Sequence, residues 1–245
     1  MLSKEEQAKI GQLCQESSQA MEVCSLMNKQ NQLQLSMVSH EIRNPVTLIN
    51  SFLQLLGSSH PEITSYHYWT EITENMRFLR ELLENLSAYN NAQKLSREEV
   101  SILSILKTVI ADTEPTLSEK NITIQLKKDG AVPPFLMDRH RLRQVFLNLI
   151  RNSSEAIGES GGRITIHLTA DLDQVTVRIQ DSGPGIPEEF LDSLFDFFVT
   201  HKKNGTGLGL AISKNIVEAH GGTIEASAAE EGGAVFTICL PITYV

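Results

Sequence analysis

Apolar residues recur at steps of three and four through the first part of the chain. In residues 35–56 they are Leu35, Val38, Ile42, Val46, Ile49, Phe52 or Leu53, and Leu56. Such steps place side chains on one face of an α-helix, with an average close to a coiled-coil repeat. Residues 62–91 repeat the pattern with Trp69, Ile72, Met76, Leu79, Leu83 and Leu86. Glycine and proline within residues 57–61 indicate a helix end and a new start, so the pattern predicts an antiparallel helical hairpin.

A single hairpin of this kind leaves half of its apolar stripe uncovered. Two hairpins make a four-helix bundle, so the pattern predicts a homodimer through this region. Residues 3–33 extend the first helix backward with a thin stripe, made by Ile10, Leu13, Met21, Cys24 and Met27. Pairing with a second copy in a coiled coil would cover that stripe.

The pattern changes after a polar stretch at residues 90–97, which we interpret as a linker. Helical spacing covers residues 100–119, 139–157, 188–195 and 208–220. Strand-like segments cover residues 122–126, 133–137, 163–169, 174–180, 223–228 and 234–240. Strands and helices in this order predict an α+β sandwich with a mixed sheet under helices.

Composition and charge narrow the class of protein. The chain has 245 residues, 41% apolar and 21% charged, enough for one large or two ordinary globular domains. A net charge of −9 argues against nucleic-acid binding through a broad basic surface. No run approaches the ~18 apolar residues of a membrane span, and the N-terminus lacks the apolar core of a signal peptide. Three cysteines without metal-binding spacing fit reduced thiols. We therefore expect a cytoplasmic protein with no membrane insertion.

The first helical run contains the sequence His-Glu-Ile-Arg-Asn-Pro at residues 40–45. His40 falls off the apolar stripe, so its imidazole is expected to face water, with Glu41 beside it and Asn44 one turn later. Pro45 has no N–H group, so the Glu41 carbonyl loses its helical partner and the helix is loosened there. Taken alone, these residues favour a solvated helix face with an incidental histidine.

Asp181 follows a predicted strand and begins a loop that contains Gly183 and Gly185. A carboxylate at a strand end can accept a hydrogen bond from an exocyclic amine, and glycine lets the backbone approach a flat ring closely. An isolated string of this kind is also an ordinary turn.

Gly205, Gly207 and Gly209 lead into the helix predicted for residues 208–220. Backbone N–H groups at a helix start, unobstructed by side chains, form a site suited to phosphate. The stretch is not a Lys-bearing phosphate loop, because no Lys-Ser/Thr pair follows, and it lacks the preceding strand of a dinucleotide fold.

Asn148 and Asn152 are four residues apart and project from one face of a predicted helix. Two amide oxygens near a phosphate site suit Mg²⁺, which keeps several waters and takes few protein ligands. The alternative for Asn148 is a hydrogen bond to the adjoining backbone, and the spacing leaves both open.

The order of these clusters is more specific than any one of them. They resemble the boxes of sensor histidine kinases: the H box at residues 40–45, the N box at 148–152, the G1 box at 181–186, the F box and start of the ATP lid at 195–202, and the G2 box at 205–210. The resemblance spans about residues 33–242.

This resemblance implies a helical segment at residues 1–32, a dimerisation and histidine-phosphotransfer hairpin at 33–95, and an ATP-binding α+β sandwich of the Bergerat type at 96–245. It implies autophosphorylation of His40 and transfer of the phosphoryl group to an aspartate of a response regulator. Glu41 would accept a proton and hold the reactive tautomer. Asn44 matches a position that orients water when such kinases dephosphorylate their regulator.

The same resemblance implies that ATP and Mg²⁺ bind. Asn152 and Asn148 would hold Mg²⁺, Asp181 would accept a hydrogen bond from the adenine amine, and Lys202 would neutralise a phosphate. The nucleotide-binding set also includes Gly183, Gly185, Ile186, Phe198, Gly205, Thr206, Gly207, Leu208 and Gly209, and the glycines of residues 205–209 would bring N–H groups to the phosphates.

Some positions depart from the family pattern. Asp196 and Val199 stand where many relatives have Glu and Phe or Thr. Glu155 stands where some relatives have Lys, which weakens the case for a phosphate-binding cation there. His220, before two glycines, is interpreted as a feature of a helix C-terminus.

Two other classes of protein share parts of this pattern. An ATP-binding adaptor or regulator phosphatase without autokinase activity is one, but His40, Glu41, Asn152 and Asp181 are all present and argue against such a loss. ATP-driven clamps similar to gyrase or heat-shock chaperones need further downstream domains, which we do not expect here. The sequence does not identify the input signal, an upstream sensor partner, the response regulator, or whether transfer occurs within or between subunits.

Overall fold

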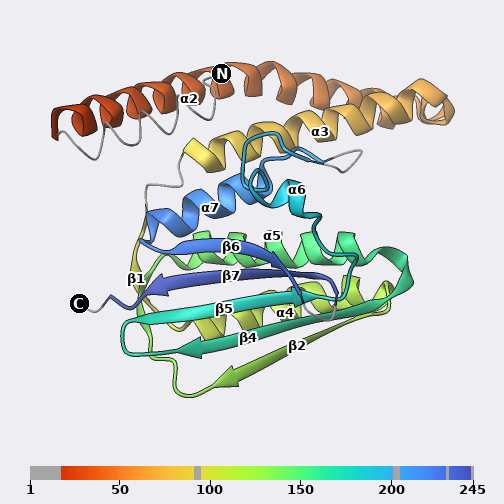
Figure 1. Ribbon diagram of the computed structural model, residues 1–245. Helices are drawn as coiled ribbons and strands as arrows, with labels where there is room; N and C mark the ends of the chain where they lie inside the picture. Colours follow the sequence, from red (N-terminus) through yellow and green to blue (C-terminus); the bar gives the residue numbers. More distant parts are fainter. Residues whose placement is uncertain (1–17, 91–94, 201–204, 230–231, 244–245) are drawn as a thin grey trace. The chain divides into compact units, whose positions relative to one another are not determined.

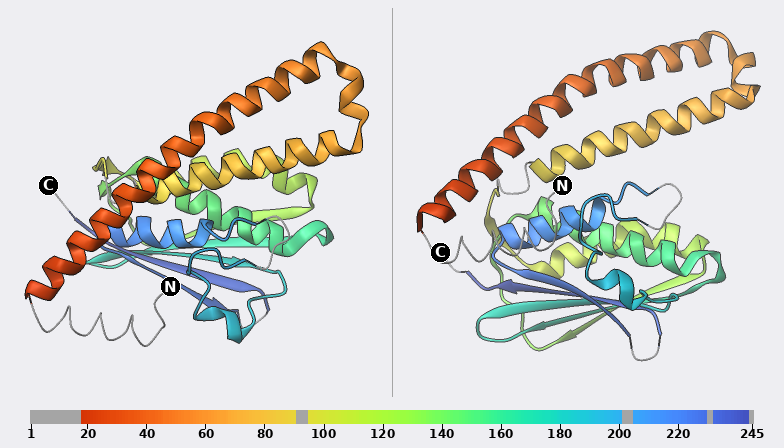
Figure 2. Two further views of the ribbon diagram at one scale, coloured as in Figure 1. Left: turned by 90° about the horizontal axis from the view of Figure 1, so that it is seen from above. Right: turned by 45° about the horizontal axis from the view of Figure 1, so that its top comes forward.

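The computed structural model describes residues 18–90, 95–200, 205–229 and 232–243 (Figure 1). The chain divides into two compact units, Met1–Asn90 and Asn91–Val245. In the first unit, helices α2 (Ser18–Ser59) and α3 (His67–Asn90) lie side by side, joined through the 3-10 helix η1 (Pro61–Ser65) (Figure 2). The predicted helical hairpin is therefore confirmed.

The turn of the hairpin differs from its prediction. Helix α2 continues past Gly57, where it was expected to break, to Ser59, and α3 begins at His67 rather than at residue 62. A Cβ atom at Gly57 would lie 2.9 Å from Cζ2 of Trp69, so the bare glycine makes room for the indole ring within the helix. The extended backbone of Tyr66 (φ −75°, ψ 135°) then separates η1 from α3.

Arg43 ties the two helices of the hairpin together. Its Nη2 donates to the carbonyl oxygen of Leu83 at 3.3 Å and also to the hydroxyl of Ser87. Val46 and Leu83 are buried, at 4% and 6% exposure. Pro45, which was expected to loosen α2, lies inside the helix without ending it.

The second unit is a five-stranded mixed sheet with helices over one face (Figure 1). Its strands in spatial order are β2 (Ile122–Asp129), β4 (Gly162–Ala170), β5 (Gln174–Asp181), β7 (Ala234–Pro241) and β6 (Thr223–Ala228). Strand β2 is parallel to β4, and the other neighbours are antiparallel. The longer helices are α4 (Ile102–Glu119), α5 (Arg139–Ile157) and α7 (Gly209–Ala219). This arrangement is the α+β sandwich that the sequence predicts.

Alternate residues of the central strands build the core of this unit. The buried strand residues are Ile164, Ile166 and Leu168 of β4 and Val175, Val177 and Ile179 of β5. The buried residues of α5 include Leu142, Val145, Phe146, Leu149 and Ile150. A period of two in the strands and steps of three and four in the helix direct both sets into one layer. The intervening strand residues therefore face away from the helices.

Two elements differ from the sequence pattern. Strand β1 (Glu98–Val100) was not predicted, and it pairs antiparallel with β3 (Phe135–Met137) in a separate two-stranded sheet. Two of its three residues are exposed glutamates, so it has no apolar signal. The helix predicted for residues 188–195 is shorter, with α6 covering Glu188–Leu191. Among the described residues, no helix has both the length and the apolar character to cross a membrane.

Candidate functional site

Asp181 is fixed at the end of β5 by backbone donors. Its side chain is buried, and its Oδ1 accepts the N–H groups of Gly183 at 2.9 Å and Ala234 at 3.1 Å. These two bonds join the loop after β5 to the start of β7. A buried carboxylate held by two backbone bonds has a defined orientation, as a recognition group requires.

Gly233 allows this arrangement, and the sequence reasoning missed it. A Cβ atom at Gly233 would lie 1.9 Å from the carbonyl oxygen of Asp181, and its φ of +92° favours glycine. The adjacent pair Gly232 and Gly233, between β6 and β7, was the available signal. Gly185 (φ +83°) lies against the same turn, because its Cβ would be 3.1 Å from the Gly233 carbonyl oxygen.

Helix α5 contacts both glycine-bearing loops. Near its end, a Cβ atom at Gly183 would lie 3.3 Å from the Ala156 carbonyl carbon, so the loop after Asp181 lies against α5. Two turns earlier, a Cβ at Gly209 would lie 2.5 Å from Oδ1 of Asn148. Eight residues of α-helix span about 12 Å, so α5 positions the two predicted ends of the site at a fixed separation.

Asn148 connects α5 to α7. Its Nδ2 donates to the hydroxyl of Ser213 at 2.9 Å, and that hydroxyl donates to the Gly209 carbonyl oxygen at 3.0 Å. The amide oxygen of Asn148 thus faces the first residue of α7. The side chain of Asn148 is thus linked to the backbone of Gly209 through the Ser213 hydroxyl. Asn152 lies one turn further along α5 and is half-buried.

Ser153, next to Asn152, was not singled out from the sequence. Its side chain is 1% exposed, and within the described part of the chain its hydroxyl has no hydrogen-bond partner. A buried hydroxyl in this condition can bond a water molecule or a ligand group. Its position directly after Asn152 places that capacity on the helix that carries both asparagines.

The loop before α7 is hydrogen-bonded to the predicted F box and packs closely against it. The N–H of Phe198 donates to the carbonyl oxygen of Gly207 at 3.0 Å, and a Cβ at Gly207 (φ +65°) would lie 2.5 Å from the Phe198 carbonyl carbon. The structure thus brings Phe198 and Gly207 together. Gly205 and Thr206 are half-buried, and the Thr206 hydroxyl accepts the N–H of Leu208 at 3.4 Å. Lys202 lies outside the described residues.

The predicted phosphoacceptor residues lie on α2 in the first unit. Glu41 and Asn44 are exposed, whereas Ser39 and Val46 are buried. The helix includes His40, whose side chain lies outside the described residues. Exposed positions for Glu41 and Asn44 agree with the face assigned to them from helical spacing.

Among the described residues, no group of three His, Cys, Asp or Glu side chains could hold a metal ion.

Two family models match the chain, one for each unit. Residues 30–95 match the His Kinase A (phospho-acceptor) domain, and residues 137–244 match the family described as histidine kinase-, DNA gyrase B-, and HSP90-like ATPase. The chain therefore belongs to the sensor histidine kinases of two-component systems.

Individual relatives agree with this assignment. Sporulation kinase E of Bacillus subtilis is 33% identical over 84% of this chain, which spans 28% of that protein's length. The crystal structure of full-length ShkA in complex with AMPPNP is similar with a TM-score of 0.74 and 27% identity, over 86% of this chain and 46% of that one. The catalytic domain of the histidine kinase ThkA is 35% identical with a TM-score of 0.57, over 61% of this chain and 97% of that one. ThkA in complex with the response regulator TrrA gives a TM-score of 0.63 at 29% identity, over 88% of this chain and 64% of that one.

Proposed function

We propose that this chain is an ATP-dependent protein-histidine kinase that phosphorylates itself on His40 and passes the phosphoryl group to an aspartate of a response regulator. The supporting observation is that one chain carries a phospho-acceptor hairpin containing His40 and a separate unit of the ATPase family. Each part alone fits other roles, whereas together they supply both the nucleophile and the phosphoryl donor.

The proposed reaction begins with the neutral imidazole of His40. A ring nitrogen attacks the γ-phosphorus of ATP, an N–P bond forms, and the bond from that phosphorus to the β–γ bridging oxygen breaks to release ADP. Glu41 accepts the proton lost from the other ring nitrogen. In the second step the N–P bond breaks as the regulator's aspartate takes the phosphoryl group. Asn44, exposed one turn after His40, would orient water for dephosphorylation of the regulator.

The proposed nucleotide site lies along α5. Both backbone bonds to Asp181 end on Oδ1, so we assign Oδ2 to the adenine amine. The N–H groups at the start of α7 and the residues before it would receive the phosphates, because a helix N-terminus favours anions. The amide oxygens of Asn148 and Asn152 fit Mg²⁺, which would reduce the charge of the phosphates when bound. Lys202 would add a cation.

We also propose that the first unit dimerises. The hairpin leaves Ile42, Ile49, Phe52 and Leu56 between 42% and 55% exposed. These residues continue the apolar stripe of α2, and a second hairpin would cover them in a four-helix bundle. The proposed segments are the coiled-coil entry at residues 1–32, through which an upstream sensor would act, the dimerisation and phosphotransfer domain at 33–95 and the catalytic domain at 96–245. Because the reaction consumes ATP, we place these domains in the cytoplasm.

The decisive experiment incubates the 245-residue chain with γ-labelled ATP and Mg²⁺ and compares it with His40→Gln. His67→Gln is a matched control, because His67 is a strongly exposed histidine of the same hairpin. We expect label in the unsubstituted chain and in His67→Gln but not in His40→Gln. The label should be lost in acid and kept in base, as a phosphoramidate bond requires. Absence of label despite measured ATP binding would contradict autokinase activity and favour an adaptor or regulator phosphatase.

A further inference from the structure

The face of the large sheet that points away from the helices carries a cluster of basic side chains. Lys127 of β2 lies opposite His167 of β4, and His167 lies opposite Arg178 of β5. These three side chains form a row across three neighbouring strands. Arg163, four residues before His167 on β4, projects from the same face. We call these four residues the open-face basic cluster.

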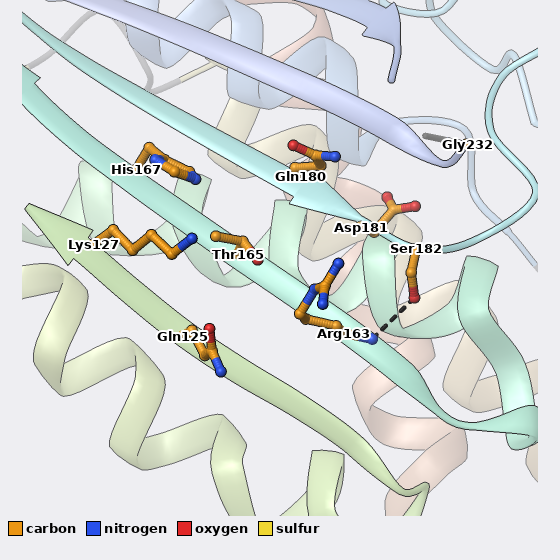
Figure 3. Close-up of a pocket in the computed structure, with 9 residues that line it drawn as sticks. All are labelled: Gln125, Lys127, Arg163, Thr165, His167, Gln180, Asp181, Ser182 and Gly232. Atoms are coloured by element: carbon orange, nitrogen blue, oxygen red, sulfur yellow. Dashed lines mark hydrogen bonds between the residues drawn. The ribbon is translucent and has the colours of Figure 1, made fainter. Parts of the chain in front are cut away.

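The cluster borders a hollow in the sheet surface. The hollow has a volume of about 250 Å³. Six of its lining residues have donor side chains in the strands, namely Gln125, Lys127, Arg163, Thr165, His167 and Gln180, and Asp181, Ser182 and Gly232 line its end. Figure 3 shows Lys127 and Arg163 extending over the sheet from neighbouring strands, with Thr165 between them. Thr165 is buried, so it forms part of the floor. Each of these six side chains can donate a hydrogen bond, which suits an acceptor-rich ligand.

The basic side chains of this face are not ion-paired within the part of the chain that the structure describes. Within residues 95–200, 205–229 and 232–243, none of the four cluster residues forms an ion pair. Among the described residues, the strand carboxylates on this face are Asp129, two residues beyond Lys127, and Glu225, which is two strands away from Arg178 through Thr237. The carboxylate of Asp181 lies at the end of the hollow. Lys127, Arg163 and Arg178 gather like charges on one face of the sheet, and like charges repel one another. In a chain of net charge −9, this grouping therefore needs an explanation.

We infer that the hollow binds a small molecule carrying two or more linked phosphoryl groups. Arginine and lysine around a floor of neutral donors match phosphate chemistry, because the charges attract the anion and the donors fix its oxygens. A recessed floor favours a small ligand over the surface of an acidic protein, which would reach the rim but not Thr165. The hollow meets the proposed nucleotide site at Asp181, which also lines the hollow. The cluster residues lie on the open face of the sheet, whereas the loop that follows Asp181 contacts α5 on the helix side.

The test follows the backbone amide signals of the full chain by NMR while pyrophosphate is added. We expect saturable shifts at Thr165, His167 and Gln180, at the hollow. A second set of shifts at residues 205–209 would report phosphate binding at the glycine loop, so the two sites are read separately. The inference therefore stands or falls independently of the proposed kinase activity. Shifts confined to residues 205–209, or no saturable shift at all, would overturn it.

Charge variants distinguish a built site from general attraction. Lys127→Gln and Arg163→Gln should each weaken pyrophosphate binding at the hollow by about tenfold, the usual consequence of losing a hydrogen bond to a charged group. Lys128→Gln is the matched control, because Lys128 is the next residue of β2 and its partner Leu168 is buried on the helix side. Equal losses in all three variants would overturn the site. So would a decaglutamate peptide that shifts the same amides when pyrophosphate does not, because this result would identify an acidic protein surface as the ligand.

Discussion

Nε2 of His220 accepts the backbone N–H of Asp138 at 3.0 Å, linking the end of α7 to the start of α5. Nδ1 of the same ring is 2.8 Å from the Ile216 carbonyl oxygen, so Nδ1 carries the proton. Asp138 is the N-cap of α5, with Oδ1 accepting the N–H of Arg141 and Oδ2 that of Ser96. Arg97 donates to the Ala219 carbonyl oxygen. Ser96 and Arg97, near the start of the second unit, are therefore hydrogen-bonded to the N-cap of α5 and the end of α7, the helices that carry Asn148 and Gly209.

This contact predicts a pH dependence of stability. Burial lowers the pKa of His220 below its ordinary value, because the buried ring is held neutral. In the unfolded chain a histidine takes up its proton near pH 6.5. Between the two pKa values the unfolded state binds more protons, so the free energy of unfolding falls as the pH drops below about 6.5 and is unaffected by this group above it.

The free energy of unfolding of the second unit is measured by urea unfolding at about pH 5.5 and about pH 7.5. Asp138 titrates below this range, so it does not contribute to the difference. Burial raises the pKa of Asp138, but the N–H groups of Arg141 and Ser96 outweigh it and lower that pKa overall. We expect His220→Gln to reduce the loss of stability on acidification, whereas His140→Gln, at an exposed position of α5, should retain it. An unchanged pH dependence in His220→Gln would contradict the assignment.

Asp181→Asn should weaken nucleotide binding while leaving the fold intact. The asparagine oxygen can still accept the N–H groups of Gly183 and Ala234, but its NH₂ replaces the oxygen assigned to the adenine amine. Two donors then face each other, and we expect affinity for AMPPNP to fall by about tenfold or more. Calorimetric titration measures this loss, and thermal unfolding checks the fold. Asp173→Asn, at an exposed turn position, should bind as the unsubstituted chain does.

The sequence predicted the elements whose apolar spacing is regular. Helix α5 has the predicted bounds, Arg139–Ile157, because its buried residues recur every three or four positions without interruption. Strand β1 escaped prediction because its stability comes from pairing with β3, which is distant in sequence, and spacing within three residues carries no such information. The start of α3 was misplaced because residues 61–65 form the separate 3-10 helix η1, and the extended backbone of Tyr66 delays α3 until His67.

The candidate site was predicted in part for the same reason. Motif order identified Asp181, Asn148 and the glycines, but it could not identify the partners that position them. Ser213 gives no local signal, because its contact with Asn148 joins segments far apart in sequence. The same holds for Gly233, which lies against Asp181. Such partners depend on the packing of α5, α7 and β7, which no local pattern records.

Gly233→Ala should destabilise the second unit and weaken nucleotide binding. Its φ of +92° and the 1.9 Å approach to the Asp181 carbonyl oxygen both oppose a side chain. Backbone strain of this kind costs on the order of 1–3 kcal/mol, and the clash adds to it by displacing Asp181. Gly232→Ala is the control, because Gly232 has a φ of +89° but nothing within 4 Å of its Cβ position. Equal melting temperatures and AMPPNP affinities for the two variants would contradict a role for the close approach.

Arg43 links the two helices of the hairpin, so its loss should destabilise the hairpin. Arg43→Gln removes the donor to the Leu83 carbonyl oxygen and the Ser87 hydroxyl, and it leaves these groups on α3 without their partner. A half-buried hydrogen bond from a charged group contributes about 1.5–3 kcal/mol, so we expect a lower free energy of unfolding for the hairpin. Arg80→Gln is the control, because Arg80 pairs with Glu84 on the exposed surface of α3 at 3.9 Å, where such pairs contribute little.

A double-mutant cycle that combines Arg43→Gln with Ser87→Ala measures the coupling between Arg43 and Ser87 directly. Urea unfolding of each variant is monitored by circular dichroism. A positive coupling energy that is absent between Arg80 and Ser87 would support the tie. Additive effects of Arg43→Gln and Ser87→Ala would show that the two side chains act separately. Arg43 lies three residues after His40 on α2, so loss of its hydrogen bonds to α3 should also lower the rate of His40 labelling. Arg80→Gln should leave that rate unchanged.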